Sequence, residues 1–403
     1  MRYIPEPVII KLMLLVRRVA SKSGISLWLP QRILSWLLPK VGDNVVAKPL
    51  HLADRHSDTD LVPLFAMLPA EKQYGSSICE NDLSHKDDYD LEIIIPAYNV
   101  EKYIDQCLQS VIGQRSKYKC LIVVINDGST DGTRQRLTRY EHAQNIEIID
   151  QKNSGLAAAR NVALKHIRAK YITFVDADDW LLPGAIEVLM DTAEKHNADI
   201  VEGCFRLFRG TKFYPGYNHP FEVSDHWNGQ LQGYAWGKVM RATLFANCRF
   251  PQGYLFEDTL MTLTLYPRCH HIVTIPDNIY VYRFNPVGIT ATAGRTPRAV
   301  ESLLVTIQLM EDNAERGLKQ NTQTYDNYLK NEVSNTFFTV YSLDNPSVNH
   351  HVFSACCRMM SQYFGTFSTS EPRLKPIEQA LRSKDYRDCV LAIMTRKDKN
   401  PGG

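Results

Sequence analysis

Between residues 91 and 200, apolar blocks alternate regularly with segments of helical periodicity. The apolar, β-branched blocks lie at 91–95, 121–125, 146–149 and 171–175, and the helical patterns at roughly 101–113, 131–143, 155–169 and 184–196. Continuously apolar strands that alternate with helices are typical of a parallel sheet covered on both faces. The pattern therefore predicts an α/β fold with a mostly parallel, Rossmann-like sheet.

The pattern changes along the chain and divides it into four predicted parts. Residues 1–90 form an N-terminal extension, in which a basic amphipathic segment over 1–40 precedes a polar linker. Residues 91–205 hold the alternating blocks, and residues 206–296 are less regular and rich in aromatic side chains. Residues 297–403 have a mostly helical pattern, which predicts a C-terminal helical region.

Composition and charge narrow the class of protein. The 403 residues, of which 44% are hydrophobic, suffice for two or three domains with their own cores. A formal net charge of +2 lacks the basic field usual for nucleic-acid binding, so no nucleic-acid partner is predicted. The nine cysteines are scattered without a C-x-x-C pair, which favours reduced thiols in a cytoplasm.

The first 40 residues carry seven basic side chains against one acid, Glu6, with Trp28, Trp36 and several Leu and Ile residues among them. Such a segment suits a helix lying in the headgroup layer of an anionic membrane. It equally suits an ordinary amphipathic helix packed on its own protein. The first interpretation predicts a peripheral location on the inner face of the cell membrane. A membrane-spanning helix is not predicted, because no run approaches the ~20 apolar residues that such a helix needs.

Polar, sharply turned segments follow each predicted strand, at 96–99, 126–132, 151–161 and 176–180. In sheets of this kind, ligands bind outside the carboxyl ends of the strands. A site is therefore predicted on the rim that carries Asp127, Asp131, Arg160, Asp176, Asp178 and Asp179.

Three of these aspartates, Asp176, Asp178 and Asp179, lie within four positions after the fourth apolar block. Carboxylates this close raise one another's pKa unless a cation shares them. Mg²⁺ and Mn²⁺ take oxygen ligands, usually one or two carboxylates together with substrate phosphates. The spacing predicts a partial cage for such an ion, whose open positions await a diphosphate. The alternative is a cap for the helix that begins near Pro183.

Seven motifs between about residues 91 and 290 follow the order seen in one enzyme family: IIIPAYN, VINDGSTDGT, NSGLAAARN, FVDADDW, AWGKVMR, FEDTLM and YVYRFN. Through them the chain resembles a family 2 glycosyltransferase with the GT-A fold. This inverting group builds bacterial capsules, O-antigens, lipopolysaccharide and related glycans. Residues 1–90 and 297–403 match no family pattern.

The resemblance implies a donor site. Asp127 would hydrogen-bond the base, expected to be uracil, although Asn126 stands where many relatives have a second Asp. Asp178 would bind the metal that bridges the two phosphates, while Asp179 would support it. The nucleotide-sugar pocket as a whole would comprise Pro96, Ala97, Tyr98, Asn99, Asp127, Gly155, Arg160, Asp176, Ala177 and Asp178.

The resemblance also implies a catalytic half. Asp258, paired with Glu257 in the family's ED motif, would be the general base, although two acids could instead mark an exposed helix start. Trp236 and Lys238 would meet the acceptor, with Trp236 as a sugar-stacking platform or, alternatively, a core residue. Arg283 would stabilise the leaving diphosphate or serve as a structural stacking partner.

These roles together predict a metal-dependent enzyme, using Mn²⁺ or Mg²⁺, that moves a sugar from a UDP-sugar to a glycan or lipid-linked acceptor with inversion. A sugar-phosphate nucleotidyltransferase is one alternative, but PAYNVEKY is not the Gly-rich phosphate loop it needs. A phosphatase of the haloacid dehalogenase type is disfavoured by Trp180 and by the late position of the acidic motif. The third alternative is a catalytically inactive, membrane-associated relative.

Overall fold

The computed structural model describes residues 61–67, 74–286, 288, 296–341 and 345–395. The basic amphipathic segment predicted over residues 1–40 lies outside these ranges. Within them, no helix is both long and apolar enough to cross a membrane. All nine cysteines fall inside the described ranges and are free thiols, as predicted.

The four predicted parallel strands are confirmed. They are β1 Tyr89–Ala97, β2 Cys120–Asp127, β3 Ile146–Gln151 and β4 Ala169–Phe174, side by side in the order β3-β2-β1-β4. Ile93 of β1 lies opposite Ile122 of β2 on one side and Thr173 of β4 on the other. Apolar residues run continuously along these strands because both faces of the sheet are covered.

The two faces of the sheet carry separate cores. Ile93 and Ile95 point into a core shared with α4 (Ile104–Ile112), α5 (Thr133–Leu137) and α7 (Ala185–Lys195). Ile94 points to the other face, where α6 (Leu156–Leu164) and the C-terminal helices cover it. The predicted helices are therefore present, but they are shorter than predicted because turns occupy their ends.

The sheet continues without interruption into the second half of the chain. After β4 it adds β9 (Lys238–Arg241), β6 (Ile200–Arg209), β10 (Ile272–Arg283) and β5 (Trp180–Leu181), in that order. β10 runs parallel to β6, whereas β9 is antiparallel to both β4 and β6. Two short strands lie off this path: β7 (Lys212–Pro215) pairs with β6, and β8 (Glu222–Ser224) pairs with β10. Because β6 crosses the boundary predicted between residues 205 and 206, those two parts share one sheet.

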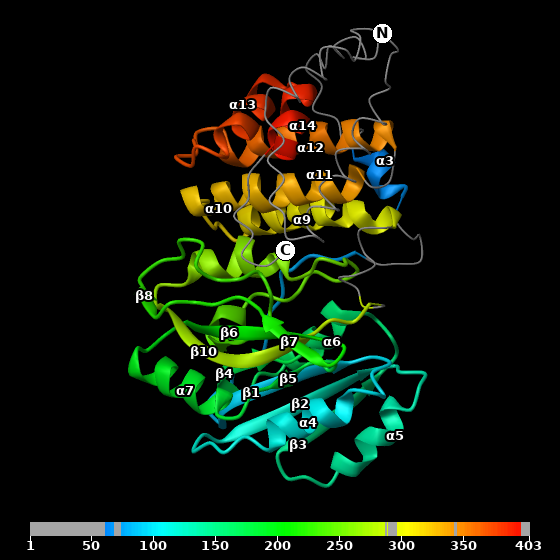
Figure 1. The fold of residues 1–403 in the computed structure, drawn as a ribbon, viewed down its shortest axis with the longest axis vertical. Coiled ribbons are helices and arrows are strands. Elements are labelled where there is room, and N and C mark those ends of the chain that lie inside the picture. The colour runs from blue at the N-terminus through cyan, green and yellow to red at the C-terminus, as the bar shows by residue number, and fades with distance from the viewer. Residues whose placement is uncertain (1–60, 68–73, 287, 289–295, 342–344, 396–403) are drawn as a thin grey trace.

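The C-terminal region is helical, as predicted, and forms layers above the sheet (Figure 1). Its elements are α9 Glu301–Glu315, α10 Thr322–Asn327, η9 Tyr328–Val333, α11 Ser334–Tyr341, α12 Pro346–Phe364, α13 Lys375–Ser383 and α14 Tyr386–Thr395. A short N-terminal helix, α3 Val62–Phe65, packs against α12.

The segment before β1 ties these helices to the sheet domain. Asp312 of α9 accepts hydrogen bonds from the Ser77 backbone N–H and hydroxyl, each at 2.6 Å, and from Ser76 Oγ at 2.9 Å. The Tyr74 hydroxyl donates to Glu301 Oε1 at 3.2 Å. Residues 74–77, predicted as a loose linker, are therefore anchored along α9.

Candidate active site

Asp127 lies at the carboxyl end of β2 and is 3% exposed. Its carboxylate accepts hydrogen bonds from Gln151 Nε2 at 2.6 Å and from the backbone N–H groups of Ser154 and Gly155, both at 2.8 Å. Gly155 has a φ of 91° at the start of α6, a conformation that favours glycine. Asp127 thus fixes the loop before α6, and its predicted contact with a base stays a prediction.

The end of β1 divides the four residues predicted to line the nucleotide. Pro96 and Ala97 are buried in the strand, whereas Tyr98 is 47% exposed and Asn99 is also exposed. Asn99 has a φ of 52°, and its side-chain oxygen accepts from the Thr130 N–H at 2.8 Å. The two exposed residues therefore stand on a rim that is joined to the loop after β2.

Arg160 of α6 connects the two acidic motifs. Its Nη1 lies 2.8 Å from Glu257 Oε1, and its Nη2 lies 3.1 Å from Asp176 Oδ1. The guanidinium group packs over the rings of Phe174 and Phe250 and is 2% exposed. Sequence reasoning placed Arg160 in the nucleotide pocket; the structure places it beneath the rim, where it neutralises both carboxylates.

The aspartates after β4 have different environments. The buried Asp179 accepts hydrogen bonds from the Arg283 N–H at 2.6 Å and from the Tyr280 hydroxyl at 2.9 Å. Burial and the charge of Asp176 raise the pKa of Asp179 well above its usual value. Ala177, between the other two aspartates, is buried. Asp179 therefore joins this loop to the end of β10, and its predicted support of a metal stays a prediction.

Asp176 and Asp178 face the rim. The Asp176 side chain is 25% exposed, and Asp178 Oδ2 accepts from Asn285 Nδ2 at 3.2 Å. Burial and the charge of Asp176 raise the pKa of Asp178. A nearby cation would relieve this repulsion, and two carboxylates suit a hard divalent ion. Within the described ranges, no group of three or more His, Cys, Asp or Glu side chains forms a ready metal cage.

Arg283, at the end of β10, clamps the acidic loop to α4. Its Nε donates to the Asp178 carbonyl at 2.7 Å, and its Nη2 donates to Gln106 Oε1 at 2.6 Å. The guanidinium group lies 4.6 Å from the Trp180 ring centroid and 4.8 Å from that of Tyr103. These contacts confirm the stacking interpretation, and the phosphate contact stays a prediction.

Glu257 and Asp258, just before the short helix η5 (Met261–Leu265), are not equivalent. Glu257 is buried against Arg160, and burial together with the charge of Asp258 raises its pKa to about 8. Asp258 is only partly buried, and burial raises its pKa as well. Among the described residues, no side chain donates a hydrogen bond to the Asp258 carboxylate, although a backbone hydrogen bond lowers its pKa. Of the two acids, Asp258 is the one left available to a substrate.

A buried acid of the C-terminal helices interacts electrostatically with Asp258. Glu332 accepts a hydrogen bond from Thr306 Oγ1 at 3.0 Å. Burial raises the pKa of Glu332 to about 7, and the charge of Asp258 adds to the shift. Sequence reasoning missed Glu332, because no motif marks it within a helical segment.

Trp236 and Lys238, predicted to meet the acceptor, are both buried. Trp236 is 7% exposed and stacks on the rings of Tyr234, Tyr280 and Tyr282. Lys238 is fully buried: its ammonium group forms an ion pair with Glu202 and donates to the Gln232 carbonyl at 2.8 Å. The structure therefore does not support the predicted direct contact of these two residues with an acceptor, because protein groups already surround both side chains.

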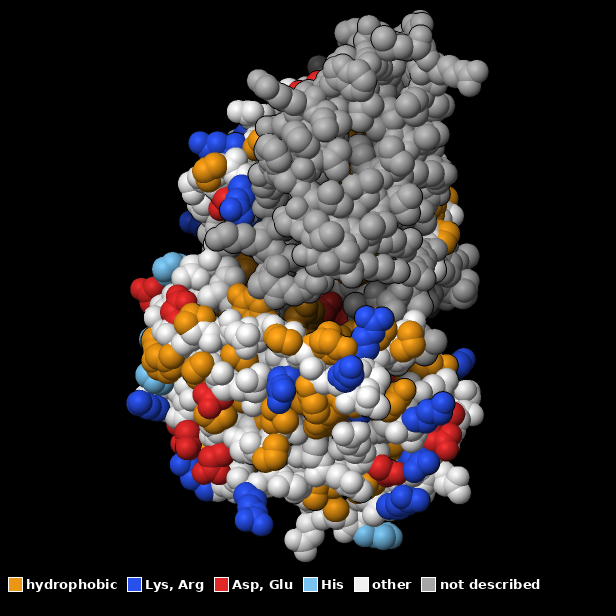
Figure 2. Space-filling model, viewed as in Figure 1, with side chains coloured by type: hydrophobic (Ala, Val, Ile, Leu, Met, Phe, Trp, Pro, Cys, Tyr) orange, Lys and Arg blue, Asp and Glu red, His pale blue; other side chains and the backbone are white. Residues whose placement is uncertain are grey.

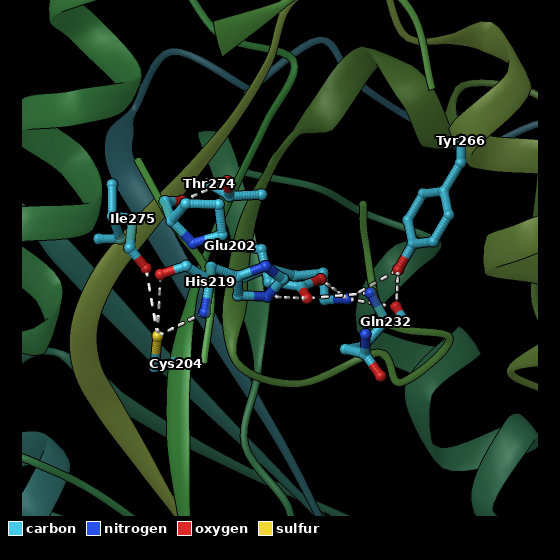
Figure 3. Close-up of polar contacts among 9 residues, drawn as sticks. Glu202, Cys204, His219, Gln232, Tyr266, Thr274 and Ile275 are labelled. Carbon is cyan, nitrogen blue, oxygen red and sulfur yellow. Dashed lines mark hydrogen bonds and ion pairs between the residues drawn. The ribbon is translucent and has the colours of Figure 1, made fainter. Parts of the chain in front are cut away.

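Glu202 is the centre of the buried network that holds Lys238 (Figure 3). Its Oε1 lies 2.7 Å from His219 Nε2 and accepts from the Gln232 N–H at 2.9 Å. The Tyr266 hydroxyl bonds both Lys238 Nζ, at 2.7 Å, and the Gln232 carbonyl. We call these residues, Glu202, His219, Gln232, Lys238 and Tyr266, the Glu202 network.

Residues 92–251 match the family model for glycosyl transferase family 2. The curled, mostly parallel sheet with an acidic motif after β4 and a second acidic pair nearby is the GT-A arrangement. Over residues 92–251, this chain is therefore similar to glycosyl transferase family 2.

Individual glycosyltransferases are also similar to this chain. The chain is 33% identical over 212 residues to glycosyltransferase GlyA of Streptococcus pneumoniae, covering 48% of this chain and 30% of GlyA. It is 29% identical over 223 residues to the uncharacterized glycosyltransferase EpsJ of Bacillus subtilis, covering 50% of this chain and 62% of EpsJ. The chain thus spans less than two thirds of the length of either relative.

Among solved structures, S. aureus TarS 1–349 in complex with UDP-GlcNAc is similar in fold. The TM-score is 0.53 at 20% sequence identity, and the match covers 75% of this chain and 90% of that one.

Proposed function

We propose that this protein transfers a sugar from a UDP-sugar to a hydroxyl group of a glycan or lipid-linked acceptor in cell-surface polysaccharide synthesis. The observation that carries the proposal is the position of Arg160. It bonds Asp176 of the first acidic motif and Glu257 of the second, so both motifs meet at one rim. Two further carboxylates of these motifs would then take part in the reaction: Asp178 would act on the donor, and Asp258 would act on the acceptor.

The donor half is inferred from the rim and from the fold. TarS, which shares the fold, binds UDP-GlcNAc, and the exposed Tyr98 and Asn99 lie next to the loop that Asp127 fixes. A uridine diphosphate on this rim would place its phosphates towards Asp176 and Asp178.

Asp178, with Asp176 beside it, would hold Mn²⁺ or Mg²⁺. The residues fit such an ion, because the set is all oxygen and the charge of Asp176 adds to burial in raising the pKa of Asp178. When bound, the metal supplies positive charge to the diphosphate.

A carboxylate of the chain itself removes the proton of the acceptor hydroxyl. The acceptor oxygen forms a bond to the anomeric carbon as the bond from that carbon to the diphosphate oxygen breaks on the opposite face. Asp258 takes the proton of the acceptor hydroxyl, and the single displacement inverts the anomeric centre. A positioned base of this kind contributes about 10²–10⁴-fold to the rate.

The test is UDP release from a panel of UDP-sugars by the full chain with Mn²⁺, comparing D258N and D178N with the exposed control D87N. We expect D258N to lose about 10²–10⁴-fold of the acceptor-dependent rate. D178N should require more Mn²⁺ for half-maximal activity, whereas D87N should match the wild type. Activity in D258N equal to that of D87N would contradict the assigned base. Release of pyrophosphate in place of UDP would support a nucleotidyltransferase, and no turnover at all would support the inactive relative.

A further inference from the structure

Four aromatic side chains form a stack beside the acidic rim, namely Tyr234, Trp236, Tyr280 and Tyr282. The rings of Tyr234 and Trp236 are parallel within 3°, with centroids 4.5 Å apart. Tyr280 lies 4.5 Å from Trp236 at 13°, and Tyr282 lies 5.6 Å from it at 8°. Trp236 is covered by these neighbours, whereas Tyr234 is 40% exposed. Tyr234 is therefore the most exposed member of the stack, whereas Tyr282 is partly buried.

The segment that carries Tyr234 is braced at both ends by the Glu202 network. Two residues before Tyr234, the Gln232 N–H donates to Glu202, and its carbonyl accepts from Lys238 and Tyr266. Two residues after Trp236, Lys238 itself is fully buried in the same network. An exposed aromatic ring held this rigidly loses little conformational freedom when a ligand binds, which is the advantage of a preorganised site.

The stack is also joined to the first acidic motif. The Tyr280 hydroxyl donates to Asp179 at 2.9 Å and accepts from the Asp176 N–H at 3.1 Å. Trp236 stacks on both Tyr280 and Tyr234, so these contacts place the exposed ring of Tyr234 beside the acidic rim.

We propose that Tyr234 is a binding platform for a pyranose ring of the acceptor. The apolar C–H face of the sugar would pack on the exposed face of the tyrosine, as aromatic rings pack on apolar surface. The acceptor is the fitting partner because its hydroxyl must reach Asp258, whereas the donor sugar is already held through its diphosphate. This inference rests on the proposed function and assigns to Tyr234 the platform role that sequence reasoning gave to Trp236.

The experiment measures UDP release at saturating UDP-sugar while an acceptor probe is varied. The probes are octyl β-glycosides of glucose, galactose and N-acetylglucosamine, and the variants are Y234A, Y234F, Y234W and the control Y214A. Tyr214 in β7 is similarly exposed, at 43%, but is no member of the stack. We expect Y234A to raise KM for the probe by about 2- to 12-fold, the factor that corresponds to one aromatic contact. Y234F and Y234W should restore it, and Y214A should match the wild type.

The outcomes separate this inference from the proposed function. If Y234A leaves KM for the probe unchanged, or changes donor hydrolysis without acceptor by the same factor, the acceptor platform is refuted. It is equally refuted if the wild type hydrolyses the donor but no glycoside stimulates UDP release. A wild type that hydrolyses no UDP-sugar refutes the proposed function instead.

Discussion

Replacing Arg160 with methionine tests whether the link between the two acidic motifs also holds the domain together. Methionine approximates the length of the arginine stem but removes the charge between Asp176 and Glu257. Glu257 is 3% exposed, so it would remain as a buried carboxylate without its partner. At pH 9, above its pKa of about 8, Glu257 is ionised, and breaking a buried ion pair then costs about 3–5 kcal/mol of unfolding free energy. For a chain of this size we expect Tm at pH 9 to fall by roughly 5–10 °C.

The effect should depend on pH in a defined direction. Burial raises the pKa of Glu257 from 4.5 to about 8, so the native state keeps a proton that the unfolded state loses above pH 4.5. Stability from this group is therefore greatest below pH 4.5 and falls as the pH rises towards 8. Without Arg160 the decline should extend to higher pH, and the difference between R160M and the wild type should be larger at pH 9 than at pH 6.

The assay is thermal unfolding at both pH values, with R134M as the matched control. Arg134 also joins two carboxylates, Glu141 and Asp150, but its side chain is 38% exposed. Exposed pairs contribute about 0–1 kcal/mol each, so R134M should change Tm by much less at either pH. The reasoning is refuted if R160M unfolds at the same temperature as R134M at pH 9.

Two further predictions concern the parts outside the sheet. D312A should lower the free energy of unfolding by about 1–3 kcal/mol, because the buried Ser77 N–H loses its acceptor. Urea titration measures this free energy. The control D225A should leave the free energy of unfolding unchanged, because the Asp225 side chain is 89% exposed. Deleting residues 1–40 should move the protein from the membrane to the soluble fraction while donor hydrolysis persists; a truncated protein that still sediments with membranes would contradict the interfacial-helix interpretation.

The first half of the sheet could be predicted because each parallel strand is an uninterrupted apolar block. β1 to β4 were found in this way, with ends that differ by a few residues. β5 has two residues and β9 has four. β5 forms only because β10 supplies its hydrogen bonds, and β9 forms only because β4 and β6 supply them. Such strands have no pattern of their own, so sequence reasoning could not place them.

The site could be predicted as a set of residues, but not as a set of contacts. The motifs correctly brought Asp127, Asp176 and Asp178 to the carboxyl ends of β2 and β4, which lie on either side of β1, because parallel strands of one sheet end at the same edge. The partners of Arg160 and Lys238, by contrast, come from distant segments that no spacing rule connects. Exposure separates Tyr234 from Trp236, two residues apart in one aromatic segment, and only packing determines which of them meets solvent.

The candidate site extends past the segment that matches the family model. The match ends at residue 251, yet Asp179 is held by Tyr280 and by the backbone of Arg283. Arg160, inside the match, is paired with Glu257 outside it. Residues 92–251 therefore cannot position their own acidic motif, because its buried carboxylates would lose the partners that offset their desolvation. The proposed donor half depends on the region that carries the proposed base. A substitution in either acidic motif should therefore change the position of the other motif through Arg160.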